Sequence, residues 1–87
     1  MKIKDGFVIR KIAGELVIVP VGPRVVELNG IISLNATGEL LWKVLQEDVD
    51  LQTLINALTA EFNVDEATAK EDIDDFIAKL SERNLLE

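Results

Sequence analysis

The side chains that could do chemistry in this chain are mostly carboxylates, and four of them crowd one segment: Glu71, Asp72, Asp74 and Asp75. Clustered carboxylates can bind a metal ion or exchange protons with a substrate. With the period of a helix, however, these four spread around its polar side, and a solvent-exposed face explains them better. We therefore predict neither a metal site nor a catalytic residue in this segment.

A second acidic cluster, Asp48-Val49-Asp50, resembles the start of a calcium-binding loop. Such a loop needs a glycine at its sixth position and a glutamate at its end, and this segment has neither. The chain also contains no Cys, His or Tyr, which excludes disulfides, thiolate and imidazole metal ligands, and nucleophiles activated by histidine. The sequence predicts a binding module that is not an enzyme and uses no metal or cofactor.

The composition is that of one folded domain spanning residues 1–87. Of these residues 48% are hydrophobic, mostly Leu, Ile and Val, which argues against disorder. No apolar run is long enough to cross a bilayer, and the N-terminal residues lack the pattern of a signal peptide. We therefore expect a cytoplasmic protein.

The charge is distributed unevenly along the chain. Residues 1–34 carry five basic and three acidic side chains, whereas residues 35–87 carry four basic and thirteen acidic ones. An acidic second half repels phosphate, which argues against a nucleic-acid partner and would suit a basic one. Solubility alone is the simpler explanation of this charge.

The first part of the sequence predicts antiparallel strands. Phe7–Ile12 and Glu15–Val19 are rich in β-branched residues, and the turn signal Ala13-Gly14 between them indicates a hairpin. Val21–Gly30 is expected to connect this hairpin to a third strand and ends in the strong turn signal Asn-Gly. The third strand is predicted at Ile31–Leu34.

The second part predicts three helices. Asn35, Asp50 and Asp65 each precede a helical pattern, and their side chains can cap a helix N-terminus. Gly38, in the first turn of the first helix, is unfavourable by propensity, and a close approach of another part of the chain would explain it. Apolar residues recur at helical spacing, as in the second helix at Leu51, Leu54, Ile55, Leu58 and Phe62.

Three strands followed by three helices predict an α+β domain. The order is that of a winged helix-turn-helix-like fold, with a three-stranded antiparallel sheet before the helices. Trp42 is expected in the core, Asn84 is expected to follow the end of the last helix, and Leu85-Leu86 should fold back onto the core.

The third strand, Ile31–Leu34, is a candidate binding element, because it carries little charge and nothing in the sequence clearly covers it. An extended peptide could pair with this edge while its side chains enter a groove beside a helix. The strand could instead be central, be covered by the last helix, or pair with a second copy to form a homodimer. DNA binding is a further alternative, although the last helix offers mainly Asp and Glu where a recognition helix needs Arg, Lys, Asn or Gln.

The segment Leu34–Trp42, L-N-A-T-G-E-L-L-W, resembles the L-N-x-T-G-x-x-I/L-W signature of PqqD-like proteins, a family named for a component of pyrroloquinoline quinone biosynthesis. The resemblance covers nearly the whole chain and includes a D-x-x-x-F-x-x-x-L pattern at Asp72–Leu80. It implies a winged helix-turn-helix-like fold, also called a RiPP recognition element, without catalytic activity.

The resemblance also implies a function and a site. PqqD-like proteins bind the leader of a ribosomally made precursor peptide and present it to a modifying enzyme, often a radical SAM protein. The leader is expected to add antiparallel to the third strand, in a cleft against the last helix. In this sequence the peptide-binding positions so implied are Ile31, Ile32, Ser33, Leu34, Asp72, Ile73, Phe76, Ile77, Lys79 and Leu80.

We therefore expect a peptide chaperone whose partners are a precursor peptide and a separate modifying enzyme, with no nucleic acid and no membrane. The long segment 21–29 departs from the compact connection of the founding members, which makes a quinone pathway less expected than another peptide pathway.

Overall fold

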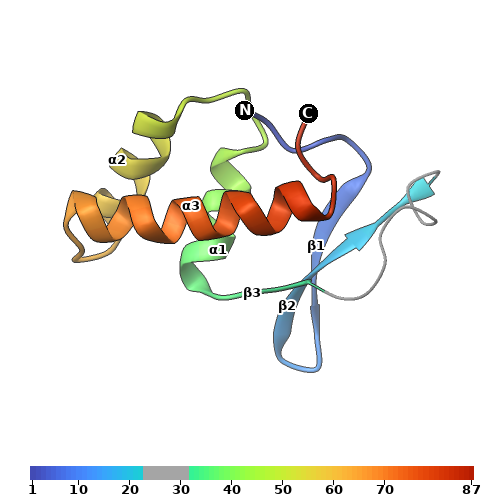
Figure 1. Ribbon diagram of the computed structural model, residues 1–87. Helices are drawn as coiled ribbons and strands as arrows, with labels where there is room; N and C mark the ends of the chain where they lie inside the picture. Colours follow the sequence, from blue (N-terminus) through green and yellow to red (C-terminus); the bar gives the residue numbers. More distant parts are fainter. Residues whose placement is uncertain (23–31) are drawn as a thin grey trace.

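The sheet is built on the predicted hairpin. In the computed structural model, which describes residues 1–22 and 32–87, β1 (Phe7–Ile12) pairs antiparallel with β2 (Glu15–Pro20). Ala13 and Gly14 both have positive φ, 53° and 84°, as a two-residue type I′ turn requires. The hairpin extends away from the helices (Figure 1).

The third strand, β3 (Ile32–Leu34), pairs antiparallel with the other side of β2, so the strand order is β1-β2-β3. Within the described residues β3 is therefore an edge strand. The predicted Asn29-Gly30 turn and the predicted start of this strand at Ile31 lie outside the described residues.

The helices begin at the three predicted caps. The helices are α1 (Ala36–Val44), α2 (Leu51–Glu61) and α3 (Glu66–Glu82), and they follow Asn35, Asp50 and Asp65 in turn. Each of these three side chains accepts a hydrogen bond from a backbone N–H group in the first turn of its helix. These bonds satisfy donors that the first turn of a helix leaves free. The expected α+β fold, with three antiparallel strands before three helices, is confirmed.

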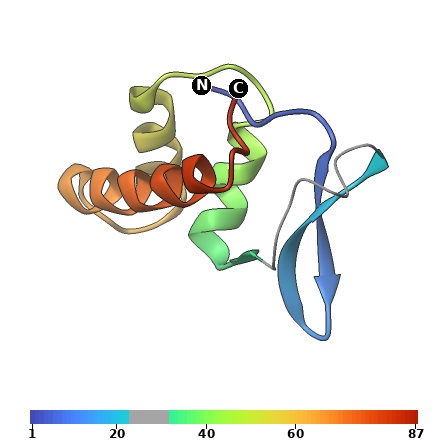
Figure 2. The ribbon, with the colours of Figure 1, turned by 45° about the vertical axis from the view of Figure 1, so that its right-hand side comes forward.

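The core lies where α1 meets the other elements. α1 runs behind α3, and α2 packs against both (Figures 1 and 2). Trp42, only 3% exposed, is in the core as expected. The completely buried core side chains, all at 0% exposure, include Leu45, Leu54, Leu58, Ile73, Leu80 and Leu85.

The two ends of the described chain lie side by side (Figures 1 and 2). Asn84 takes a positive φ of 59° after the end of α3, and Leu85 then folds back to a fully buried position, as expected. Leu86 forms a β-bridge with Ile3, and the backbone N–H of Lys4 donates to the carbonyl of Leu85 at 2.9 Å.

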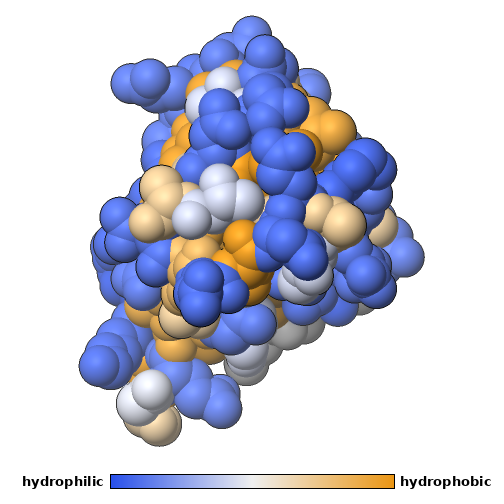
Figure 3. Space-filling view, turned by 90° about the vertical axis from the view of Figure 1, so that its left-hand side faces the viewer, coloured by the Kyte–Doolittle hydropathy of each residue, from blue (hydrophilic) through white to orange (hydrophobic). Residues whose placement is uncertain are grey.

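Hydrophilic side chains cover most of the face formed by the helices at the left of Figure 1, and apolar surface shows only in small areas between them (Figure 3). Within residues 1–22 and 32–87, no helix combines the length and the apolar character needed to cross a membrane.

Candidate functional site

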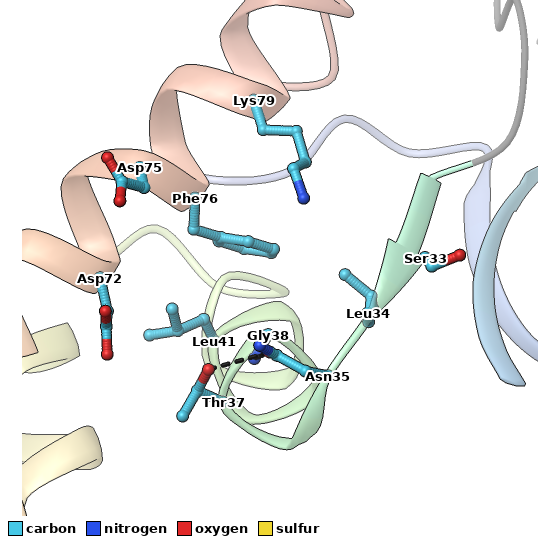
Figure 4. A pocket seen from close by; sticks show the side chains of 10 residues that line it. All are labelled: Ser33, Leu34, Asn35, Thr37, Gly38, Leu41, Asp72, Asp75, Phe76 and Lys79. Carbon is cyan, nitrogen blue, oxygen red and sulfur yellow. Dashed lines mark hydrogen bonds between the residues drawn. The ribbon is translucent and has the colours of Figure 1, made fainter.

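A groove of about 470 Å³ lies between β3, the start of α1 and one side of α3 (Figure 4). We call it the β3–α3 groove. It is lined by Ser33, Leu34, Asn35, Thr37, Gly38, Leu41, Asp72, Asp75, Phe76 and Lys79.

The strand side of the groove is formed by the end of β3. Ser33 is exposed, and Leu34 is half-buried with its side chain directed toward the Phe76 ring (Figure 4). The side chain of Ile32 is 3% exposed and belongs to the core, so it does not line the groove. One edge of β3 is occupied by β2, and no other described strand pairs with it.

The start of α1 forms the floor. Asn35 Oδ1 accepts hydrogen bonds from the Gly38 N–H at 2.8 Å and from the Thr37 hydroxyl at 2.9 Å. A Cβ at Gly38 would lie 3.3 Å from Leu34 Cδ2 and 3.5 Å from Phe76 Cε1. The close approach expected at Gly38 is thus confirmed, and it brings β3, α1 and α3 together under the groove.

The helix wall is one stripe of α3. Asp72, Asp75, Phe76 and Lys79 follow the i, i+3, i+4, i+7 spacing that places side chains on one side of a helix. Lys79 directs its ammonium group toward the space between α3 and β3, and Phe76 turns its ring toward Leu34 (Figure 4).

Three other α3 residues implied by the family resemblance do not line the groove. Ile73 and Leu80 are 0% exposed, because they belong to the stripe that α3 turns into the core. Ile77 is partly buried and packs against that core. A peptide in the groove therefore has no surface of Ile73 or Leu80 to contact.

Five of the lining residues are not among the positions that the family resemblance implies: Asn35, Thr37, Gly38, Leu41 and Asp75. Four of them lie at the start of α1 or within it. The sequence predicted only a structural role for this segment, as a helix cap and part of the core. Gly38 carried a usable signal, since a glycine in a first helical turn beside a predicted cleft indicates that the cleft reaches that turn.

The charged groups of the groove are available to a ligand. Asp72, Asp75 and Lys79 are exposed, and none forms an ion pair with another described residue. Elsewhere on α3, Lys70 bonds to Asp74 at 2.9 Å. Over residues 1–22 and 32–87, no group of three or more Asp or Glu side chains is arranged to hold a metal ion.

Comparisons with known proteins identify the family of the chain and a similar solved structure. The family model described as Coenzyme PQQ synthesis protein D (PqqD) matches residues 15–86. The solved structure of TbiB1 in complex with the TbiA(beta) leader peptide is similar, with 31% identity, a TM-score of 0.74, and coverage of 100% of this chain and 95% of that one. No protein with a curated description matches the sequence. The chain belongs to the PqqD family.

Proposed function

We propose that this chain is a non-enzymatic chaperone that binds the leader of a ribosomally synthesised precursor peptide and presents it to a separate modifying enzyme. The observation that carries this proposal is the edge of β3 beside the β3–α3 groove, with which no other described strand pairs and which we call the free edge of β3. Membership of the PqqD family and similarity to TbiB1, which was solved with a leader peptide, support it.

The leader binds as an additional strand. Its backbone pairs antiparallel with the free edge of β3, which supplies N–H and C=O groups whatever the leader's sequence. Alternate leader side chains enter the groove, where Leu34, Leu41 and Phe76 offer an apolar surface. The core residues Ile32, Ile73 and Leu80 support these walls from inside, and Ile77 packs against the same core.

Amide hydrogen exchange tests this mode of binding. The probe is the leader of a precursor peptide encoded beside the gene for this chain. Strand addition slows the exchange of the β3 amide groups that β2 leaves unpaired. It does not change the exchange of amide groups at the edge of β1 that faces away from β2. Protection of β1 instead, or of α3 alone, would contradict addition at β3.

The chaperone role needs a second measurement. We expect a modifying enzyme encoded nearby, of the radical SAM class or another, to modify the precursor faster when this chain is present. A precursor without its leader should gain nothing from the chain. If the enzyme modifies the precursor at the same rate with and without the chain, the chain does not present the precursor to the enzyme, although it can still bind the leader.

A homodimer formed through the sheet edge is a second candidate, because it would use the same free edge of β3. The two roles exclude each other at that edge. Light scattering distinguishes them, because a dimer formed through this edge should dissociate into leader-bound monomers when the leader is added.

A further inference from the structure

The charges of the β3–α3 groove are ordered along α3. Asp72 and Asp75 line the groove on the N-terminal side of Phe76, and Lys79 lines it on the C-terminal side. All three charged side chains are exposed and without an ion pair among the described residues. The groove is thus acidic at one end, apolar in the middle and basic at the other end.

The dimensions match a short extended segment. Seven residues separate Asp72 from Lys79, which corresponds to about 10 Å along the helix axis. A strand covers about 13 Å in four residues, and its side chains face the same side at every second position. Three alternate side chains of a bound strand can therefore reach the acidic end, the Phe76 region and the basic end, because Lys and Arg side chains are long and flexible.

The direction follows from the strand pairing. In Figure 4, β3 runs downward from Ser33 to Asn35 and the start of α1, whereas α3 runs upward from Asp72 past Phe76 to Lys79, so the two elements run in roughly opposite directions. A strand antiparallel to β3 therefore starts at the end of the groove near Asp72 and finishes at the end near Lys79.

We propose that the groove selects a leader segment in which a basic residue stands two positions before a bulky apolar residue and an acidic residue two positions after it. The inference rests on the proposed function, and it specifies the chemistry and the direction of the peptide. Opposite charges across a partly exposed groove stabilise the complex modestly, and a reversed peptide places like charges at both ends.

A selection experiment tests this order without knowledge of the natural leader. The full chain is used as bait for a display library of random peptides, and the enriched sequences are aligned on their bulky apolar residue. We expect Lys or Arg two positions before it and Asp or Glu two positions after it. A consensus peptide and its charge-exchanged partner should then differ in affinity by about tenfold.

Two variants with the same change in net charge make the selection specific. In the groove variant, Asp72→Lys, Asp75→Lys and Lys79→Glu reverse the charges that line the groove. In the control variant, Lys70→Glu, Glu71→Lys and Asp74→Lys reverse exposed charges of α3 that do not line it. The groove variant should enrich the opposite charge order, and the control variant should enrich the wild-type order.

The outcomes separate this inference from the function on which it rests. Enriched peptides without a charge order, or the same order with both variants, overturn the inference and leave peptide binding standing. If peptides selected by the wild-type chain carry the acidic residue before the apolar residue and the basic residue after it, the antiparallel direction is overturned. No enrichment at all, with no binding of the encoded leader, overturns the proposed function and the inference together.

Discussion

Phe76 is the residue at which the core and the groove meet. Its ring is 8% exposed and belongs to the core cluster, yet it also lines the β3–α3 groove. The core stripe of α3 includes Ile73 and Leu80, and the groove stripe includes Asp72 and Lys79, so the two stripes share only this side chain. A substitution at Phe76 therefore changes stability and the groove together, whereas Asp72 and Lys79 can be changed with little effect on the core.

Gly38→Ala should fail to stabilise the protein. In an ordinary helical position the change from Gly to Ala gains about 1 kcal/mol. Here the new Cβ would lie 3.2 Å from Asn35 Oδ1, an atom held in place by two hydrogen bonds, and 3.3 Å from Leu34 Cδ2. We expect this crowding to offset the gain, so that the free energy of unfolding in urea does not increase.

The control is the same substitution in an Asn35→Ala background. That background lacks the fixed oxygen atom, and the Leu34 side chain can turn away, so Gly38→Ala should there be stabilising. An equal gain in both backgrounds would show that Asn35 does not cause the crowding.

At the scale of elements, turn chemistry and caps set most of the boundaries. The predicted hairpin, the three caps and the starts of all three helices are confirmed, because each depends on a few neighbouring residues. The wall of the groove could not be read in the same way. Apolar spacing identifies the side of α3 that packs into the core, but it does not show which neighbouring side of the helix faces β3. The expected site therefore combined core residues such as Ile73 with groove residues such as Lys79.

The helix caps predict a loss of stability in acid. Hydrogen bonds from Thr53 lower the pKa of Asp50, and hydrogen bonds from Thr68 lower the pKa of Asp65, from an ordinary value of 3.8. A carboxylate whose pKa is lowered on folding adds stability above its unfolded pKa, and that stability is lost as pH falls through the lower, folded pKa. The melting temperature should therefore fall as the pH drops below about 4.

The matched variant for this prediction is Asp50→Asn with Asp65→Asn. Asparagine caps a helix about as well as aspartate and does not titrate in this range. The double variant should lose stability less steeply in acid than the wild type when both are followed by circular dichroism. Identical slopes would show that other carboxylates cause the loss.

The hairpin turn offers a stabilising substitution. Ala13 has a φ of 53°, a conformation that costs an L-residue with an ordinary side chain about 1–2 kcal/mol and that Asn adopts more readily. Ala13→Asn would create Asn-Gly, the favoured pair of a type I′ turn, and should raise the melting temperature by about 4–8 °C. Ala13→Val should lower it, and a rise with both would contradict this explanation.

At the scale of the whole molecule, the acidic charge decides between ligands. The chain carries a net charge of −7, and α3 exposes Glu71, Asp72, Asp74 and Asp75. Binding to DNA depends on neutralising phosphates with Lys and Arg. We predict no affinity for duplex DNA even at low salt, where electrostatic attraction is strongest. A shifted band in a gel at low salt would contradict the prediction and revive a role as a DNA-binding regulator.

The described part of β3, Ile32–Leu34, is short, and this affects how quickly a bound leader is released. Adjacent residues of an antiparallel strand present their N–H and C=O groups to opposite neighbours. Of the three described residues of β3, only one or two therefore present these groups to a new strand. Each backbone hydrogen bond contributes about 0.5–1.5 kcal/mol net. The dwell time of the complex is therefore governed by the side chains in the groove, and a leader without suitable side chains dissociates quickly.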